Sequence, residues 1–278
     1  MNVKLASRTS IDEQFYLDSF NNIPDTQIAE LIPEDITPEQ IMVYVARGSS
    51  SRQNKWEAYE KLVNYLIKHK HWSPFQFAYF CFEIETSRAI TLQMIRHASF
   101  DFQQLSQRYK NQSELEPVEL RAKPDNNRQS SADRLALISA DMYAHIQDVD
   151  TCLEQMQSAR SAMRDDRTEV VNYFGYYYNY LALKLRLDQL TFEEAVSDEG
   201  GGVAGECARF LLPSCATSTV YMNGSVRSWL SFLNVRLDTH AQKEIRDIAL
   251  EIAKTLAVEV PIIAEATNNF NDFKGNFM

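Results

Sequence analysis

The chain has 278 residues, of which 45% are apolar and 24% are charged, as in ordinary globular proteins. This length allows one large domain or two modest ones, and it needs no disulfide or metal to bury a core. The net charge of -10 excludes the overall basic footprint of a nucleic-acid-binding protein. The lack of an apolar run of about 20 residues excludes a membrane-spanning helix. We therefore expect neither nucleic acid nor a membrane as a partner.

The cysteines and the first residues both indicate a cytoplasmic protein. The four cysteines are scattered without C-x-x-C spacing, at Cys81, Cys152, Cys207 and Cys215. Disulfide frameworks and structural zinc sites normally show clustered spacing, so free thiols in a reducing compartment fit better. The opening residues MNVKLASRTS contain no apolar segment of a signal peptide. We expect a cytoplasmic location and no metal site.

The first part of the chain predicts three helices and a strand. The sequence TPEQ at residues 37–40 has the form of a helix start with proline in the first turn. Apolar residues recur at spacings of three and four in residues 55–70, which predicts an amphipathic helix. A proline in HWSPF ends that pattern, and the aromatic run at 77–86 predicts a strand. Ser87 is placed to cap a short helix that reaches Arg96.

The middle of the chain predicts an excursion followed by long helices. Residues 111–131 are polar and contain two prolines, which predicts a surface excursion. A spacing of three and four continues through residues 131–185, which predicts helical structure. The tyrosine-rich part of residues 170–187 is more typical of packing than of a cofactor site. Residues 198–211 predict a glycine-rich loop and then a helix.

The last part predicts a strand and two helices. Residues 217–221 are predicted as a strand, and Asn-Gly-Ser at 223–225 is predicted to open a helix. The sequence THAQ at residues 239–242 resembles a capping box. It precedes an amphipathic helix that we expect to end before Pro261.

Polar residues suited to a phosphate gather in residues 93–109, QMIRHASFDFQQLSQRY. Gln93 and Arg96 are three apart, which places them on one side of a helix. Ser106 and Arg108 are two apart, so they point the same way in an extended stretch. A hydroxyl beside a guanidinium is a reasonable phosphate cradle. On spacing alone, the alternative is a solvated polar stretch with an ordinary ion pair.

A second polar set follows near the C-terminus. Arg209 lies in a predicted helix, and Ser225 and Arg227 bracket the start of another. Ser231 is four residues past Arg227, and Arg236 ends that helix, where a cation also suits the helix dipole. Arginines near element ends in an acidic protein indicate an anionic ligand. No Ser-His-Asp order, HExxH motif or glycine-rich dinucleotide fingerprint competes with this interpretation.

These segments resemble the signature of the flavin-dependent thymidylate synthases, the ThyX family, in which Arg-His-Arg is followed after seven residues by Ser and then by Arg-Tyr. Further similar segments are HKHWSPFQFAYFCFEIETSRA, ARFLLP and NGSVRSWLSFLNVRLDTHAQKEIRDIA. The resemblance covers roughly residues 55–110 and 204–265 and fades over residues 1–50 and 111–131. It implies an α+β fold in which an antiparallel sheet packs with long helices. It also implies a single catalytic domain over residues 1–278, assembled as a homotetramer with active sites at subunit interfaces.

The resemblance further implies a methyltransferase with FAD as its cofactor. In that family dUMP is methylated reductively at C5 to dTMP, methylene-tetrahydrofolate supplies the carbon, and NADPH reduces the flavin. The expected partners are therefore dUMP, folate, NADPH and other copies of the chain. No enzyme cysteine attacks the pyrimidine in the family, which agrees with Cys215 as a core residue rather than a nucleophile.

Individual site residues follow from matching positions. Those that match flavin contacts are Ser73, Arg96, His97, Ala98, Gln104, Ser225, Val226, Arg227, Ser231, His71 and His240. Those that match nucleotide contacts are Gln93, Arg96, Gln104, Ser106, Arg108, Arg209 and Arg236. Arg236 matches the arginine at the uracil edge. Ser106 and Arg108 match the contacts nearest the phosphate. The residues expected to be catalytic are Arg236 and Ser106. His71 alternatively fixes the HWSP turn, and His240 alternatively has a structural role.

Four positions depart from the family pattern. Ala98 replaces the second arginine of the signature, and Gln104 stands where the family usually carries Glu. Loss of one positive and one negative charge leaves the local net charge unchanged, which predicts that the two substitutions form a compensating pair. Ser225 and Ser231 stand where Asn is expected, and a serine has a shorter reach. Two alternatives stay open: a C5-modifying enzyme that acts on UMP or forms a hydroxymethyl product, and a catalytically weak nucleotide-binding homologue.

Overall fold

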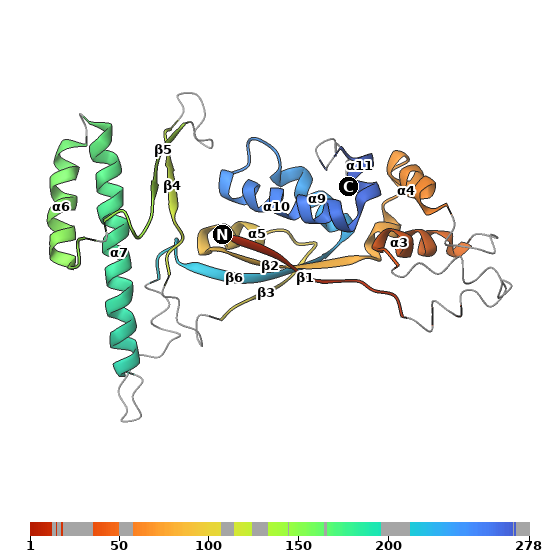
Figure 1. The fold of residues 1–278 in the computed structure, drawn as a ribbon, viewed down its shortest axis with the longest axis horizontal. Helices are drawn as coiled ribbons and strands as arrows, with labels where there is room; N and C mark the ends of the chain where they lie inside the picture. The colour runs from red at the N-terminus through yellow and green to blue at the C-terminus, as the bar shows by residue number, and fades with distance from the viewer. Residues whose placement is uncertain are drawn as a thin grey trace. The chain divides into compact units, whose positions relative to one another are not determined.

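The computed structural model describes most of the chain as two compact units (Figure 1). The described residues are 1–12, 15, 18, 36–49, 58–106, 114–123, 133–143, 145–163, 166–195, 212–268 and 270. Unit 1 is drawn from residues 1, 85–94 and 104–220, and unit 2 from residues 2–84, 95–103 and 221–278. The boundary between the units therefore falls within or beside strands β2, β3 and β6.

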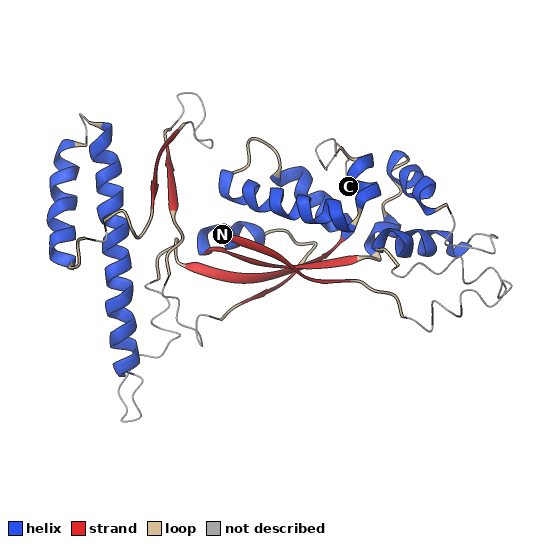
Figure 2. Ribbon diagram, in the orientation of Figure 1, coloured by secondary structure: helices blue, strands red, loops and turns tan. Residues whose placement is uncertain are grey.

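Helices and strands are mixed along the chain (Figure 2). The strands are β1 Asn2–Arg8, β2 Tyr79–Ser87, β3 Asp101–Gln104, β4 Val118–Arg121, β5 Arg134–Ile138 and β6 Thr217–Ser225. The helices are α3 Pro38–Ala46, α4 Tyr59–Lys68, α5 Arg88–Met94, α6 Val149–Ala162, α7 Arg167–Ala195, α9 Val226–Arg236, α10 Lys243–Glu259 and α11 Pro261–Ala266, with short 3-10 turns η1 Arg47–Ser49 and η2 Ser73–Gln76. The predicted helix at 55–70 is confirmed in its described part as α4, and the predicted strand at 77–86 is confirmed as β2.

The main sheet has the strand order β1-β2-β6-β3, and β4 and β5 form a separate antiparallel pair. Strands β2 and β6 run in opposite directions. In unit 2 the backbone N–H of Val226 donates to Ala78 O at 2.8 Å, and in unit 1 that of Arg88 donates to Ala216 O at 2.9 Å. As residue numbers rise on one strand they fall on the other, which is the antiparallel pattern. The predicted mixed fold with an antiparallel sheet is confirmed.

The core of unit 2 is apolar and rich in aromatic rings. Alternate residues of β2 are fully buried, among them Phe80 and Phe82, because a strand presents every second side chain to the same face. Helices α9 and α10 lie over this face (Figure 1). Trp229 of α9 packs edge-on against Phe82, with ring centroids 5.0 Å apart, and its indole N–H donates to Phe80 O at 3.1 Å. The expected amphipathic helix before Pro261 is confirmed as α10.

A buried carboxylate joins helices α3 and α11 of unit 2. Helix α3 begins with the predicted motif, a capping box in which Thr37 and Gln40 each accept from the other's backbone N–H. Within this turn Glu39 is 1% exposed and accepts a hydrogen bond from the Ile263 N–H at 2.8 Å. It thus caps the first turn of α11, whose N-terminal N–H groups have no partner within that helix. Burial raises the pKa of Glu39 from its ordinary 4.5 to about 7.

In unit 1, helices α6 and α7 pack as an antiparallel pair beside the β4-β5 hairpin (Figure 1). The ring of Tyr143 lies directly over Gly175 in the interior of α7, where an added Cβ would come within 1.9 Å of it. Asn179 donates to Ile146 O at 3.0 Å and to Cys152 Sγ at 3.3 Å. Burial raises the pKa of the Cys152 thiol, as expected of a packed rather than a reactive cysteine.

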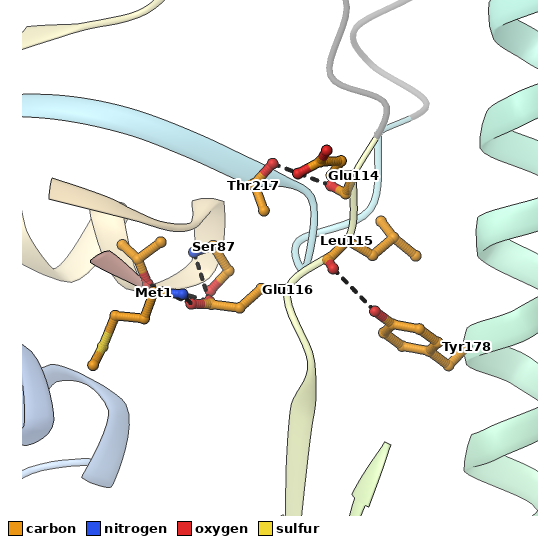
Figure 3. A network of polar contacts seen from close by, with 8 residues as sticks. Met1, Ser87, Glu114, Leu115, Glu116, Tyr178 and Thr217 are labelled. Carbon is orange, nitrogen blue, oxygen red and sulfur yellow. Dashed lines mark hydrogen bonds and ion pairs between the residues drawn. The ribbon is translucent and has the colours of Figure 1, made fainter. Parts of the chain in front are cut away.

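A polar network at Glu116 ties the segment before β4 to its neighbours in unit 1 (Figure 3). The Glu116 carboxylate accepts from the Ser87 N–H at 2.6 Å and lies 3.4 Å from the Met1 amino group. The adjacent carbonyl of Leu115 accepts from the Tyr178 hydroxyl of α7 at 3.0 Å. Two successive residues therefore connect the end of β2 with the long helix.

The described residues 133–143 and 145–148 are not helical, contrary to the spacing. Residues Arg134–Ile138 form β5, which pairs with β4 inside the expected surface excursion, and turns follow. Helix α6 begins only at Val149, because the Asp148 side chain accepts from the Thr151 N–H at 2.7 Å and fixes the helix start there. The expected loop and helix at 198–211 lie outside the described residues.

Three local predictions at helix ends were also wrong. Asn223 and Gly224 belong to β6, and only Ser225 caps α9. Helix α10 begins after Gln242 without a side-chain cap, because the Asp238 carboxylate instead accepts from the His240 N–H at 2.7 Å. Helix α5 ends at Met94, so Arg96 lies in the following turn rather than on the helix that carries Gln93.

Candidate functional site

Two of the predicted site residues, Arg236 and His97, form a direct side-chain hydrogen bond. Strand β6 passes directly into α9 at Ser225, whose hydroxyl accepts from the Ser228 N–H at 3.2 Å. Arg236 ends this helix, and its Nε donates to His97 Nε2 at 3.0 Å. The two residues are 139 positions apart, and both belong to unit 2. The signature segment, which contains His97, is thus in hydrogen-bond contact with the later similar segment, which contains Arg236.

Burial and the neighbouring guanidinium keep His97 neutral. Burial, and then the charge of Arg236, lower the pKa of His97 from 6.5 to about 4. Since Nε2 accepts from Arg236, the ring proton of the neutral imidazole resides on Nδ1. The ring also packs against Phe232, with centroids 5.0 Å apart. His97 therefore acts as a fixed hydrogen-bond acceptor and not as a cation at neutral pH.

The charges of two guanidinium groups, Arg96 and Arg236, act on each other at this place. Burial lowers the pKa of Arg236, and the positive charge of Arg96 lowers it further. Arg96 is exposed, and within the described part of the chain neither arginine forms an ion pair with a carboxylate. Like charges that lie close together without compensation favour an anion or an electron-rich ligand between or beside them.

The loop that carries His97 is fixed from both sides. The ring of Phe100 packs so closely on β6 that a Cβ at Gly224 would lie 2.4 Å from it. Ser228 of α9 donates its hydroxyl hydrogen to Ser99 O at 2.9 Å. Strand and helix together therefore determine where the 97–100 segment lies, and with it the imidazole.

Gln104 lies in unit 1 and makes a second, separate set of contacts. It ends β3, and its Nε2 is 3.3 Å from Thr91 Oγ1 and 2.7 Å from Ser218 Oγ. Gln93 is half-buried on α5, and Ser106 is exposed just past β3. Gln93 and Gln104 thus come from two of the elements that the resemblance connects with the nucleotide.

The remaining predicted residues are more dispersed. Exposed at the surface of the described chain are Ser73, His71, Ala98 and His240. Arg227 and Ser231 are half-buried on α9, and Val226 is buried. The imidazole of His240 lies 2.7 Å from Asp238, and that of His71 packs edge-on against Tyr65. Arg108 and Arg209 lie outside the described residues.

Several supporting residues were missed in the sequence. Ser99, Phe100, Gly224 and Ser228 hold the His97 loop, and Thr91 and Ser218 hold Gln104. One signal was available for Ser218: the inward-facing positions of β6 fall on even residue numbers from 218 to 224. Single hydroxyl groups such as Thr91 leave no comparable pattern.

Comparison with known proteins decides the relationship. The family model described as "Thymidylate synthase complementing protein" (Thy1) matches residues 30–262. The chain belongs to this family. A flavin-dependent thymidylate synthase from Synechocystis sp. is 34% identical over 234 residues, which cover 84% of this chain and 91% of that protein. A probable flavin-dependent thymidylate synthase from Paramecium bursaria Chlorella virus 1 is 32% identical over 232 residues, covering 83% and 90%. The resemblance stated from the signature is confirmed.

The fold of this Thy1 family member also agrees with a solved structure. A UMP/dUMP methylase from Streptomyces cacaoi, crystallised with 5-Br UMP, superimposes with a TM-score of 0.56 at 18% identity, covering 98% of this chain and 95% of that one. At this identity the likeness supports the fold alone. Over the described ranges no helix is both long and apolar enough to cross a membrane, and no group of three metal-ligating side chains is found there.

Proposed function

We propose that this chain is a flavin-dependent thymidylate synthase, which methylates dUMP reductively at C5 and forms dTMP. Within the structure, the observation that carries the proposal is the neutral His97 that orients Arg236, together with a second guanidinium, Arg96, whose charge acts on Arg236. No carboxylate among the described residues pairs with either arginine. A nucleoside monophosphate and a flavin dinucleotide both carry phosphate charge that such a site favours. The family signature and a second segment that resembles the family meet at this contact.

Arg236 is assigned to the uracil edge and to the stabilisation of charge in the ring. Its Nε is occupied by His97, which leaves the N–H groups of both terminal nitrogens for a ligand. A fixed guanidinium is already oriented when negative charge develops on the pyrimidine, so it costs no reorganisation in the transition state. Ser106 is assigned to the phosphate together with Arg108 and Arg209.

The donor set fits FAD. Arg96, His97, Arg227 and Ser231 offer cationic and neutral donors on α9 and in the loop that α9 holds, and we assign them to the flavin. When bound, FAD supplies the hydride that completes the methyl group, with NADPH as its reductant and methylene-tetrahydrofolate as the one-carbon donor. Burial raises the pKa of Cys215, so its thiol is largely protonated at neutral pH. This supports a reaction without a cysteine nucleophile.

We further assign a homotetramer with active sites at subunit interfaces. Four of the positions that match flavin contacts, Ser73, His71, Ala98 and His240, are exposed in the single chain. Exposure of ligand-contacting positions is what a site completed by another copy requires. The free thiols of Cys81, Cys152 and Cys215 support a reducing, cytoplasmic environment.

The visible absorption spectrum of the purified protein tests the proposal. We expect a flavin band that shifts as dUMP is added, and dTMP formation when methylene-tetrahydrofolate and NADPH are supplied. Turnover of dUMP should exceed that of UMP and dCMP. A protein that stays colourless with added FAD would overturn the flavoenzyme assignment. Preferred turnover of UMP would replace dUMP as the substrate and leave the chemistry in place.

A further inference from the structure

Two buried hydroxyl groups hold the side-chain amide of Gln104. Gln104 is half-buried at the end of β3, whereas Thr91 on α5 and Ser218 on β6 are each only 1% exposed. The amide nitrogen of Gln104 lies 3.3 Å from Thr91 Oγ1 and 2.7 Å from Ser218 Oγ. All three residues belong to unit 1. An amide nitrogen has two hydrogens, and here two buried oxygens stand ready to accept them.

The bond that Thr91 makes to its own helix decides which way the amide faces. Thr91 Oγ1 donates its one hydrogen to Arg88 O at 3.0 Å, so toward Gln104 it can only accept. Only the nitrogen end of the amide can satisfy an acceptor, which places Nε2 against the hydroxyl pair. Gln104 Oε1 then lies on the opposite side of the amide, and no described residue donates to it.

We infer that Thr91 and Ser218 are positioning residues that present Gln104 Oε1 to the nucleotide, where it accepts a hydrogen bond from a neutral N–H or O–H group. The inference rests on the proposed function, in which Gln104 contacts the nucleotide. A carboxylate at position 104 would direct an oxygen at the lone pairs of Thr91, which is unfavourable unless that carboxyl is protonated. The hydroxyl groups of Thr91 and Ser218 thus give a physical reason why position 104 carries glutamine, where the resemblance leads one to expect Glu.

A double-mutant cycle on the FAD-loaded enzyme tests the inference, with the Kd of dUMP measured by calorimetry. Thr91→Val keeps the shape of the side chain and removes the acceptor. With Gln104 present we expect the Kd to rise about 5- to 10-fold, the effect of one lost orienting hydrogen bond. In the Gln104→Leu background the same change should leave the Kd unaltered, because no amide remains to be oriented. Thr91→Ser should restore the affinity.

Stability is read separately, because Thr91→Val also removes the hydroxyl bond to Arg88 O. The melting temperature should fall in both backgrounds, and further where Gln104 is present, because the bond from its amide is lost there as well. The effect on the Kd should appear in that background alone. Thr255→Val is the matched control, because Thr255 makes the same kind of bond to its own helix, to Glu251 O at 3.1 Å. It should leave the Kd unchanged.

A pH series adds a signature that a purely structural role would not produce. Gln104→Glu should weaken dUMP binding as the new carboxyl ionises, and the loss should recover at low pH. An equal rise in Kd from Thr91→Val in both backgrounds would overturn the inference and leave the proposed function intact. Failure of the FAD-loaded wild type to bind dUMP would instead refute the proposed function.

A dUMP analogue shows which group of the nucleotide, the sugar hydroxyl or the ring N–H, donates the hydrogen bond to Gln104 Oε1. 2′,3′-Dideoxyuridine monophosphate lacks the sugar hydroxyl and keeps the ring N–H. If the sugar is the donor, Gln104→Leu should cost no affinity for this analogue; if the ring is the donor, the cost should stay. A Gln104→Leu enzyme that binds dUMP as tightly as the wild type would contradict both versions.

Discussion

Replacement of His97 separates its role as a hydrogen-bond acceptor from its role as a packed ring. His97→Leu fills similar space but cannot accept the hydrogen bond from Arg236 Nε, whereas His97→Gln retains an acceptor oxygen. The bond is 3.0 Å long and its donor is charged. Hydrogen bonds to charged groups contribute about 1.5–3 kcal/mol, and since His97 is only partly buried the lower end applies.

A loss of about 1.5 kcal/mol in positioning corresponds to a roughly tenfold fall in kcat/KM for dUMP. We expect this fall for His97→Leu at pH 8, and a fall of less than about threefold for His97→Gln. The assay is dTMP formation by FAD-loaded enzyme under limiting dUMP. His145→Gln, which replaces an exposed histidine of unit 1, is the control and should keep wild-type kinetics.

Equal losses in the leucine and glutamine variants would refute the reasoning, because they would show that the ring alone matters. The pH profile supplies an independent check. Because the pKa of His97 is held at about 4, its protonation should add no inflection to kcat/KM above pH 5.5. An inflection near pH 6.5 that disappears in His97→Gln would contradict the neutral acceptor role.

Three further predictions concern stability. The folded-state pKa of Glu39, about 7, exceeds its ordinary 4.5, so its contribution to stability is full below pH 4.5 and is lost as pH rises through 7. Glu39→Gln should therefore match the wild type in urea unfolding at pH 4.5 and exceed it at pH 8, by at most about 3 kcal/mol. Gly224→Ala should destabilise by about 1–3 kcal/mol and lower kcat/KM, because its Cβ displaces Phe100 and the His97 loop. Gly175→Ala should lower the melting temperature, although alanine is the better helix former by about 1 kcal/mol, since its Cβ meets the Tyr143 ring.

Each of these has a distinct contrary result. A constant difference between Glu39→Gln and the wild type across pH would show that Glu39 does not titrate between the two states. A Gly224→Ala enzyme that loses stability but keeps full kcat/KM would disconnect Phe100 from the imidazole. A Gly175→Ala protein more stable than the wild type would show that Tyr143 moves aside without cost.

Regular elements with a clear hydrophobic period were predictable from the sequence. The alternation in β2 and the three-four spacing in α10 each occur where one face packs on a core, so local pattern and final structure agree. The segment after residue 131 shows the opposite case. Leu135 and Ile138 are three apart, which suits a helix, but pairing of β5 with β4 outweighs that preference. Nothing local to the segment reveals its partner strand.

The site was predictable as a set of residues and not as a set of contacts. The family resemblance identified His97 and Arg236 in two separate segments, but their hydrogen bond depends on β6 and α9 bringing these segments together. Gln93 and Arg96 were expected on one helix, and the early end of α5 separates them. Thr91 left no signal, because isolated hydroxyls are common throughout any sequence, and the alternation of β6 showed only that Ser218 faces inward.

The direct passage from β6 into α9 makes the position of Arg236 sensitive to chain length. No loop residue separates Ser225 from Val226, so the 11-residue helix, about 16 Å long, follows the end of the strand without a linker. A single residue inserted into α9 before Arg236 would rotate that guanidinium by about 100° around the helix axis. A substitution in α9 keeps this angle, whereas an insertion or deletion would turn the arginine away from His97. Length variation within the family should therefore avoid the segment between residues 221 and 236.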